Sequence, residues 1–388
     1  MSKYLYKGKS PLQYGELFID NFLANNTVDD FETDDFKKYG VSDYINIPTY
    51  IKGVFLFGIE KIYRQNRKEQ YGKFISDWLD RVLDENKKLK QIEGHTWASL
   101  ISLDFRQPGL MLFRQYEETG NIRYLNAIGE LCESLFADYP KTSNGILWHN
   151  KVTTPNQVWV DGLYMAGPLC AGYARMTGKE EFARHAIDQA IKMYEFMHDE
   201  KDGLMFHGWD ESRTAVWADS ETGLSAEKWG RGLGWYVVAV TEIIDILGKD
   251  YEGIDELIRI LKQVLAALMK VQRQEDGYWC QIIDKPNAEG NWRETSATCL
   301  ITMAIAKAYR LGIVDERYLV AARKAFEGVI DSIREDESGS LVLGEVCKGT
   351  NVGSNYQYYS DRPKCENDRH GTGAFLQMCA ELNLCQEE

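Results

Sequence analysis

Two aspartates in aromatic surroundings are the first residues of this sequence that could do chemistry. Asp161 lies in VWVDGLYMAGP (residues 158–168), where an apolar helical pattern begins, and Asp104 lies in SLDFRQPG. An Asp at a helix start is often an N-cap whose side chain accepts backbone N–H bonds, and Asp104 could equally be a turn or cap residue. If both carboxyls instead lie together and shielded from water, the pKa of one rises into the range of an acid–base catalyst.

Two later stretches favour the chemical interpretation. HGWDES begins at His207 and WGRGLGWYV runs from Trp229 to Val237, and both mix aromatic and charged residues where a loop meets a helix. This mixture suits a sugar site, because aromatic rings stack on the pyranose face while charged groups orient the hydroxyls. A loop His such as His207 also serves often as a structural hydrogen-bonding residue.

Arg231 lies between two glycines and between Trp229 and Trp235. Its planar guanidinium could hold an anionic group such as a substrate carboxylate, or it could stack on a Trp for packing. The surrounding glycines do not form a nucleotide-binding fingerprint, since no strand precedes them and the GxGxxG spacing is missing.

A third candidate region is CENDRHGTGAF near the C-terminus, where His370 precedes the last helical pattern and Tyr358 and Tyr359 lie just upstream. If the last unit closes a ring, this loop returns to the same place as the others. The six histidines are scattered without HxxxH or HExxH spacing. We therefore predict no metal site and no cofactor.

Composition narrows the functional class. The 388 residues include 45 basic and 59 acidic side chains, and the net charge of −14 argues against non-specific nucleic-acid binding. No apolar run is long enough to span a membrane, and the N-terminus lacks a signal-peptide pattern. Eight cysteines without a CxxC pair indicate free thiols in a reducing compartment. We expect a cytoplasmic protein; the sequence does not indicate its oligomeric state.

Two series of glycines reveal an internal repeat of roughly 60 residues. One series ends apolar helical patterns, and the other precedes short extended segments such as NGILWHN and DGLMFHG. The first series comprises Gly120, Gly178, Gly248 and Gly312, and the second comprises Gly145, Gly203, Gly277 and Gly339. The chain has room for about six such helical hairpins.

Six hairpins could form a closed double ring or an open α-solenoid. The first helix of each unit is apolar on most faces, as in GLGWYVVAVTEIIDIL, whereas the second is amphipathic, as in IDELIRILKQVLAALMKVQ. An inner ring sheathed by an outer ring satisfies both patterns. We therefore predict an all-α (α/α)6 barrel formed by residues 1–388 as one domain, with the long loops at one mouth.

The motifs quoted above, together with RETSAT, MAIAKAYRLG, EVCKGTNVG and NDRHGTGAF, resemble the unsaturated rhamnogalacturonyl hydrolases of glycoside hydrolase family 105. They follow that family's order and cover about Trp97 to Glu381. The resemblance implies the same barrel, with Asp161 as general acid and base and Asp104 as second active-site Asp. It also implies that the sugar and uronate subsite is lined by His207, Trp229, Arg231 and Trp235.

The N-terminal region departs from the family pattern. In INIPTYIKGV, Pro48 stands where the family has a Trp, and Tyr50 is the residue expected to reach the site. His370 is a further substrate-binding candidate.

The activity implied is removal of a 4,5-unsaturated galacturonyl residue from the non-reducing end of rhamnogalacturonan-derived oligosaccharides, in pectin degradation. The double bond is an enol ether, so protonation at C4 and hydration at C5 need only one carboxyl that acts as acid and then as base. One alternative is a hydrolase for unsaturated glucuronyl units of glycosaminoglycans. The others are a sugar 2-epimerase that uses His207 and His370, and a helical-repeat interaction scaffold without a catalytic role for Asp161.

Overall fold

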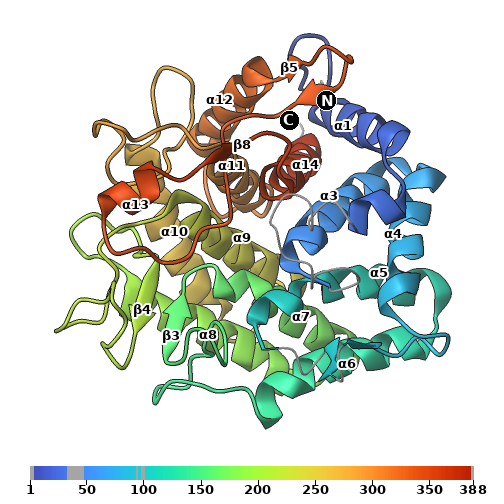
Figure 1. Cartoon of the computed structure of the whole chain (residues 1–388), viewed down its shortest axis with the longest axis horizontal. Coiled ribbons are helices and arrows are strands. Elements are labelled where there is room, and N and C mark those ends of the chain that lie inside the picture. Colours follow the sequence, from blue (N-terminus) through green and yellow to red (C-terminus); the bar gives the residue numbers. More distant parts are fainter. Residues whose placement is uncertain (1–3, 33–47, 93–94, 98–100, 386–388) are drawn as a thin grey trace.

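The protein is a double ring of helices, seen end-on in Figure 1. The structure, a computed structural model, describes residues 4–32, 48–92, 95–97 and 101–385. The inner ring consists of α3 (Tyr50–Asn66), α5 (Leu110–Thr119), α7 (Gly162–Thr177), α9 (Gly230–Leu247), α11 (Thr295–Arg310) and α14 (Arg369–Leu384). Each inner helix packs on the next, and α14 packs back on α3 to close the ring. The predicted (α/α)6 barrel is confirmed.

The outer ring covers the inner one. It consists of α4 (Glu69–Val82), α6 (Ile122–Ala137), α8 (Glu180–Met197), α10 (Ile254–Lys270), α12 (Glu316–Ser332) and α1 (Pro11–Asn25). Burial follows the predicted division: every residue of α9 from Gly230 to Ile244 is buried, whereas α10 buries one apolar face that includes Leu257, Leu261 and Leu268.

The sixth hairpin is assembled from the two ends of the chain. Helix α14 is its inner member and α1 is its outer member, and the two pack together through Phe18 and Phe375, whose ring centroids are 4.7 Å apart. Helix α1 begins with a capping box in which Ser10 and Gln13 bond to each other's backbone N–H groups. The apolar spacing of Leu12, Leu17, Phe18 and Phe22 predicts this helix from the sequence, and its position explains how the ring closes.

Both glycine series lie at left-handed positions, as the repeat predicts. In the series that ends helices, φ is 64° at Gly120 and 72° at Gly178. In the series that precedes the extended segments, φ is 84° at Gly145 and 79° at Gly203. A side chain is disfavoured at such φ angles, so glycine is the residue that these turns select.

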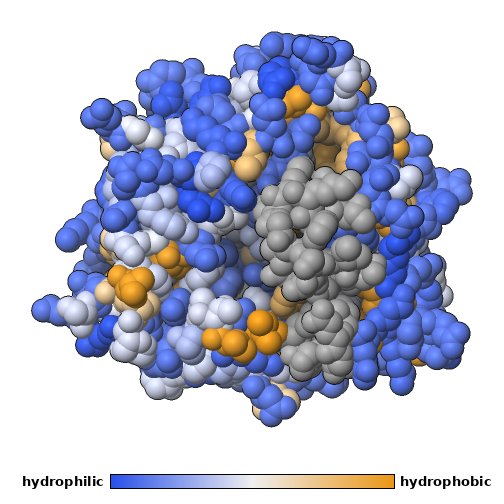
Figure 2. Space-filling view, viewed as in Figure 1, coloured by the Kyte–Doolittle hydropathy of each residue, from blue (hydrophilic) through white to orange (hydrophobic). Residues whose placement is uncertain are grey.

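Short strands and 3-10 turns lie in the loops that connect the helices of the barrel. The strand pairs are β1 (Gln91–Ile92) with β2 (His95–Thr96), β3 (Gln157–Trp159) with β4 (Gly208–Asp210), β5 (Arg334–Glu335) with β6 (Leu341–Val342), and β7 (Val346–Cys347) with β8 (Lys364–Cys365). A short helix, α13 (Tyr356–Ser360), lies near α10 in this view (Figure 1). This face is mostly hydrophilic and is hollowed near its centre (Figure 2).

Several other sequence-based expectations can be compared with the described ranges. All eight cysteines are free thiols, as predicted. In these ranges no helix has the length and apolar character that crossing a membrane requires. One hydrophobic cluster includes residues of every inner helix, but the assignment of residues 1–388 to one domain stays a prediction. The sequence predicts a loop or a helical turn on the surface for the acidic stretch NNTVDDFETDDFKKYG; residues 28–32 are helical, and residues 33–40 lie outside the described residues.

The end of the barrel opposite the loops is closed by buried ion pairs. Lys307 of α11 lies 2.9 Å from Glu242 of α9 and 3.6 Å from Glu381 of α14, and Lys61 of α3 lies 2.7 Å from Glu242. Burial alone would raise the pKa of Glu242, but Lys307 and Lys61 outweigh it and lower the pKa to about 2. Four inner helices are thus tied together by paired charges.

We predict that Glu242→Gln destabilises the barrel by about 3–5 kcal/mol at pH 7, because two lysines lose their shared carboxylate in a buried site. The folded-state pKa of Glu242 lies below its unfolded value of about 4.3, so this stabilisation is present above that value and is lost as the pH falls toward 2. Urea unfolding at pH 7 measures the loss.

The matched control is Glu256→Gln on α10, which removes an exposed pair with Arg259. It should cost less than about 1 kcal/mol. Equal losses for the two variants would show that the buried network does not hold the ring together.

Candidate active site

Asp161 lies at the N-cap position of α7, immediately after β3. Its backbone is helical, with φ −73° and ψ −19°, and its side chain makes no capping hydrogen bond. Among the described residues its Oδ1 atom, although buried, has no hydrogen-bond partner. Glu294, at the start of α11, behaves differently and accepts bonds from two backbone N–H groups. The interpretation of the Asp161 side chain as an N-cap is therefore wrong, and its carboxyl is left for another purpose.

Asp104 lies in the 3-10 turn η3 (Leu103–Phe105), which leads through a second turn, η4 (Gln107–Gly109), into α5. Burial raises the pKa of Asp104 to about 6, against a hydrogen bond from Ser102 and the charge of His370, which lower it. Burial also raises the pKa of Asp161; the charge of Asp104 adds to this rise, and His149 and Arg231 oppose it. The two carboxyls thus lie close enough to interact, with Asp161 buried and Asp104 partly buried.

His149 links the two aspartates and was missed by the sequence analysis. Its Nε2 atom lies 3.6 Å from Asp104 Oδ1, and its ring stacks on Trp159 with centroids 4.2 Å apart. Burial lowers the pKa of His149, with the charge of Asp161 opposing. The signal was in the repeat itself: His149 is the fourth residue after Gly145, as His207 is the fourth after Gly203.

His207 is fully buried beside Asp161. Its Nε2 atom lies 3.9 Å from Asp161 Oδ1, and its Nδ1 atom lies 2.7 Å from the hydroxyl of Tyr359. That hydroxyl already accepts a bond from the N–H of Gly353, so we assign its own proton to a bond with Nδ1. Burial, together with His149 and Arg231, lowers the pKa of His207 well below its usual value. A neutral His207 therefore directs Nε2–H toward Asp161.

Arg231 is buried against Trp229, with the guanidinium carbon 4.5 Å from the ring centroid. Nη1 donates to the carbonyl of Cys347, and Nη2 donates to the carbonyl of Lys348 at 3.0 Å. The stacked arrangement predicted as one alternative is present. The fork itself holds the segment at β7, so a substrate carboxylate would meet the charge of Arg231 rather than two free Nη groups.

Tyr50 is the first residue of α3 and is partly exposed. The pKa of its phenol is raised well above 10 by burial; Arg231 opposes this rise, and Asp104 and Asp161 add to it. Tyr50 therefore lies among the same charged groups. Pro48 just before it is buried, while residues 45–47 of the divergent stretch lie outside the described residues.

Trp235 and His370 lie behind this surface. Trp235 is 1% exposed and stacks on Tyr164 with ring centroids 4.4 Å apart. His370 is 0% exposed and contacts the Tyr50 hydroxyl. Six of the eight residues named from the sequence thus lie close together, His370 joins them through its contact with Tyr50, and Trp235 packs on Tyr164 in the interior.

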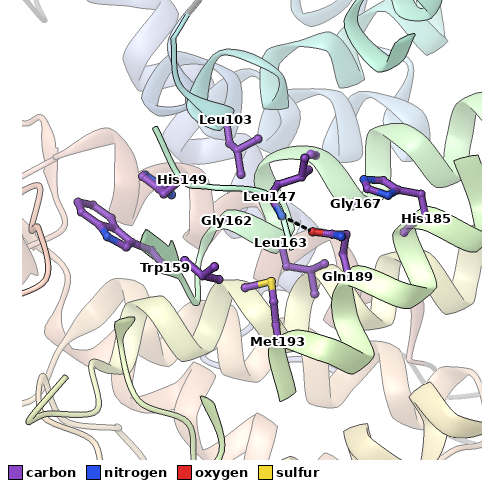
Figure 3. A pocket seen from close by; sticks show the side chains of 13 residues that line it. Leu103, Leu147, His149, Trp159, Gly162, Leu163, Gly167, His185, Gln189 and Met193 are labelled. Atoms are coloured by element: carbon purple, nitrogen blue, oxygen red, sulfur yellow. Dashed lines mark hydrogen bonds between the residues drawn. The ribbon is translucent and has the colours of Figure 1, made fainter. Parts of the chain in front are cut away.

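A small apolar pocket lies between α7 and α8, next to this site (Figure 3). His149 and Trp159 lie at one end of it, and His185 lies at the other. The amide of Gln189 accepts a bond from Leu147 N, so this polar group is already occupied. Neither aspartate lines the pocket. It is a space beside the His149–Trp159 stack and not the place where the two carboxyls meet.

We predict that Asp104→Asn stabilises the protein at pH 7 by about 2 kcal/mol. The folded-state pKa of about 6 exceeds the unfolded value of about 3.9, so ionisation of Asp104 reduces stability as the pH rises between these values. Asparagine removes that cost. Urea unfolding should show the gain at pH 7 and almost none at pH 4; an equal gain at both values, or a loss at pH 7, would contradict the assignment.

Comparisons with known proteins show which family this chain resembles. The model of Glycosyl Hydrolase Family 88 matches residues 24–385. The unsaturated rhamnogalacturonyl hydrolase YesR of Bacillus subtilis (strain 168) is 25% identical over 334 residues, which are 85% of this chain and 88% of that protein. A solved family 105 glycoside hydrolase from C. acetobutylicum ATCC 824 is 31% identical with a TM-score of 0.84, covering 95% of this chain and 99% of that one.

A more distant structure, the unsaturated glucuronyl hydrolase of Bacillus sp. GL1, shares the fold at 17% identity and a TM-score of 0.66, covering 94% of this chain and 96% of that one. The family model spans nearly the whole barrel, and the solved family 105 enzyme matches it from end to end. The chain therefore belongs to the glycoside hydrolases of families 88 and 105.

Proposed function

We propose that this enzyme removes a 4,5-unsaturated galacturonyl residue from the non-reducing end of rhamnogalacturonan-derived oligosaccharides. The observation that carries the proposal is the buried, uncapped carboxyl of Asp161, with Asp104 and two neutral histidines around it. The relative named unsaturated rhamnogalacturonyl hydrolase, which matches most of this chain, supports the choice of sugar.

The chemistry needs one group that gives and then takes a proton. The raised pKa of Asp161 favours its protonated form, which donates to C4 of the enol ether. The C4–H bond forms as the double-bond electrons move, and positive charge develops on C5 and the ring oxygen. Asp161, now a carboxylate, takes a proton from water while the water oxygen bonds to C5. The resulting hemiketal opens, and the partner sugar leaves with its own oxygen.

The neighbours of Asp161 suit both steps. Ionised Asp104 raises the pKa of Asp161 and so favours the acid form before the first step. After the proton is given, the Nε2–H of His207 points at the new carboxylate and stabilises it without adding a full charge. In this scheme Asp104 tunes the acid and His207 stabilises the base.

The remaining residues are assigned to the sugar. The charge of Arg231, held by Trp229 and the segment at β7, attracts the uronate carboxylate. Tyr50 contacts the ring from α3, and Trp235 and His370 act from behind it. A substrate-binding role for each of these residues stays a prediction, as does a cytoplasmic location.

A second substrate class is supported by one observation. The unsaturated 3S-rhamnoglycuronyl hydrolase of Alteromonas sp. (strain LOR) is 28% identical over 227 residues, which are 58% of this chain and 50% of that protein. The same mouth could therefore accept another unsaturated uronyl unit, such as a glucuronyl residue, with the same chemistry at C4 and C5.

We predict that the purified enzyme bleaches the ultraviolet absorbance of unsaturated galacturonyl-rhamnose and that Asp161→Asn slows this decay by at least about 10³-fold, because both proton transfers are lost. Circular dichroism should show the variant folded. The matched control is Asp188→Asn on α8, which changes an exposed carboxylate paired with Lys192 and should leave the rate unchanged.

An unsaturated chondroitin disaccharide serves as the comparison substrate. Decay with chondroitin alone would assign the enzyme to the glucuronyl class. No decay with either substrate would contradict the proposed function.

A further inference from the structure

A chain of three side chains connects the start of α14 to the start of α3. Asp368 Oδ1 lies 2.5 Å from His370 Nδ1, and His370 Nε2 lies 2.6 Å from the hydroxyl of Tyr50. Asp368 is 2% exposed and His370 is 0% exposed, whereas Tyr50 is partly exposed at the mouth. The chain therefore runs from the interior to the surface that faces the substrate.

We assign the direction of the hydrogen bonds from the donors and acceptors that these groups offer. Asp368 Oδ1 also accepts the backbone N–H of His370 at 3.0 Å, as a carboxylate does at a helix N-terminus. A carboxylate only accepts, so Nδ1 of His370 carries a hydrogen and donates it to Asp368. We assign the second bond as one in which Nε2 of His370 accepts the proton of the Tyr50 hydroxyl. The lone pairs of the Tyr50 oxygen are left for other partners.

We propose that Asp368 and His370 are positioning residues that hold Tyr50 as a hydrogen-bond acceptor for a hydroxyl group of the bound uronyl ring. The inference rests on the proposed function, since it assigns a sugar hydroxyl as the partner. The raised pKa of Tyr50 agrees with it, because the phenol keeps its proton and shares it with His370. Burial of His370 explains why it acts through Tyr50 and does not contact the sugar itself.

On the opposite side of the site, a second His–Tyr pair has the histidine and the tyrosine in exchanged positions. There Tyr359 lies behind and His207 lies in front, so His207 presents Nε2–H, a donor, toward Asp161. The two His–Tyr pairs thus offer a donor on the side of α9 and an acceptor on the side of α3. A hydroxyl that donates to Tyr50 fixes the ring against the carboxyl of Asp161.

The test is a double-mutant cycle on the full-length enzyme with unsaturated galacturonyl-rhamnose. Tyr50→Phe removes the acceptor and should lower kcat/KM by about 10- to 100-fold. His370→Asn keeps a group near Asp368 but is too short to reach Tyr50, and it should lower kcat/KM by a similar factor. In the Tyr50→Phe background the same change should cost less than about threefold, because its target is already gone.

His370→Gln is the conservative control, since its side-chain oxygen can reach Tyr50 and accept the phenolic proton. It should retain kcat/KM within about fivefold of the wild type, and thermal unfolding should show that His370→Asn and His370→Gln are equally stable. A purely structural His370 predicts instead that both variants lose activity in proportion to their stability.

A second readout identifies the partner as a sugar hydroxyl. With 2-deoxy and 3-deoxy forms of the unsaturated substrate, the loss caused by Tyr50→Phe should vanish for one of the two. Losses that multiply in the double mutant, or a Tyr50→Phe loss unchanged on both deoxy substrates, would overturn the inference while the wild type stays active. An inactive wild type would overturn the proposed function, and the inference with it.

Discussion

The site depends on the carboxyl of Asp161, which is buried at the start of a helix but does not cap that helix. An Asp in this position ordinarily accepts backbone N–H bonds, which lowers its pKa and makes it a poor acid at neutral pH. The helical backbone of Asp161 turns the side chain away from this role, and the surrounding protein then raises its pKa. His149, Asp104 and Arg231 therefore shift the pKa of a carboxyl that does not cap its helix.

The two ends of the barrel show how the same residue type is tuned in opposite directions. Burial raises the pKa of both Glu242 at the closed end and the partly buried Asp104 at the mouth, yet the resulting pKa is about 2 for the first and about 6 for the second. The difference is the neighbours: Lys61 and Lys307 contact Glu242, whereas the neighbour of Asp104 is the neutral His149. Paired charges hold the ring together at one end, and less fully paired carboxyls form the proposed active site at the other.

Much of the fold could be predicted from the sequence because it repeats. Glycines at left-handed turns marked the units, and the contrast between apolar and amphipathic helices separated the inner ring from the outer ring. The same repeat placed Asp104 and Asp161 at one mouth. It also contained His149, at the position equivalent to His207, although this signal was not used.

Other features depend on contacts between distant residues and could not be predicted. The carbonyl groups that occupy Arg231 lie 116 and 117 positions along the chain, and Tyr50 meets His370 across 320 positions. No local sequence pattern predicts such pairs, because these residues come together only when the ring of helices closes. The sequence identified Tyr50 and His370 separately as substrate-binding candidates; their contact indicates that one supports the other.

The central claim is that Asp161 delivers a proton to C4 and then directs water to C5. The most direct measurement is to run the reaction in D2O and examine the earliest product by NMR. We predict a single deuterium at C4, in one configuration, formed by the wild type and not by Asp161→Asn. Deuterium in both configurations, or release of an uronate whose 4,5 double bond is intact, would contradict this account.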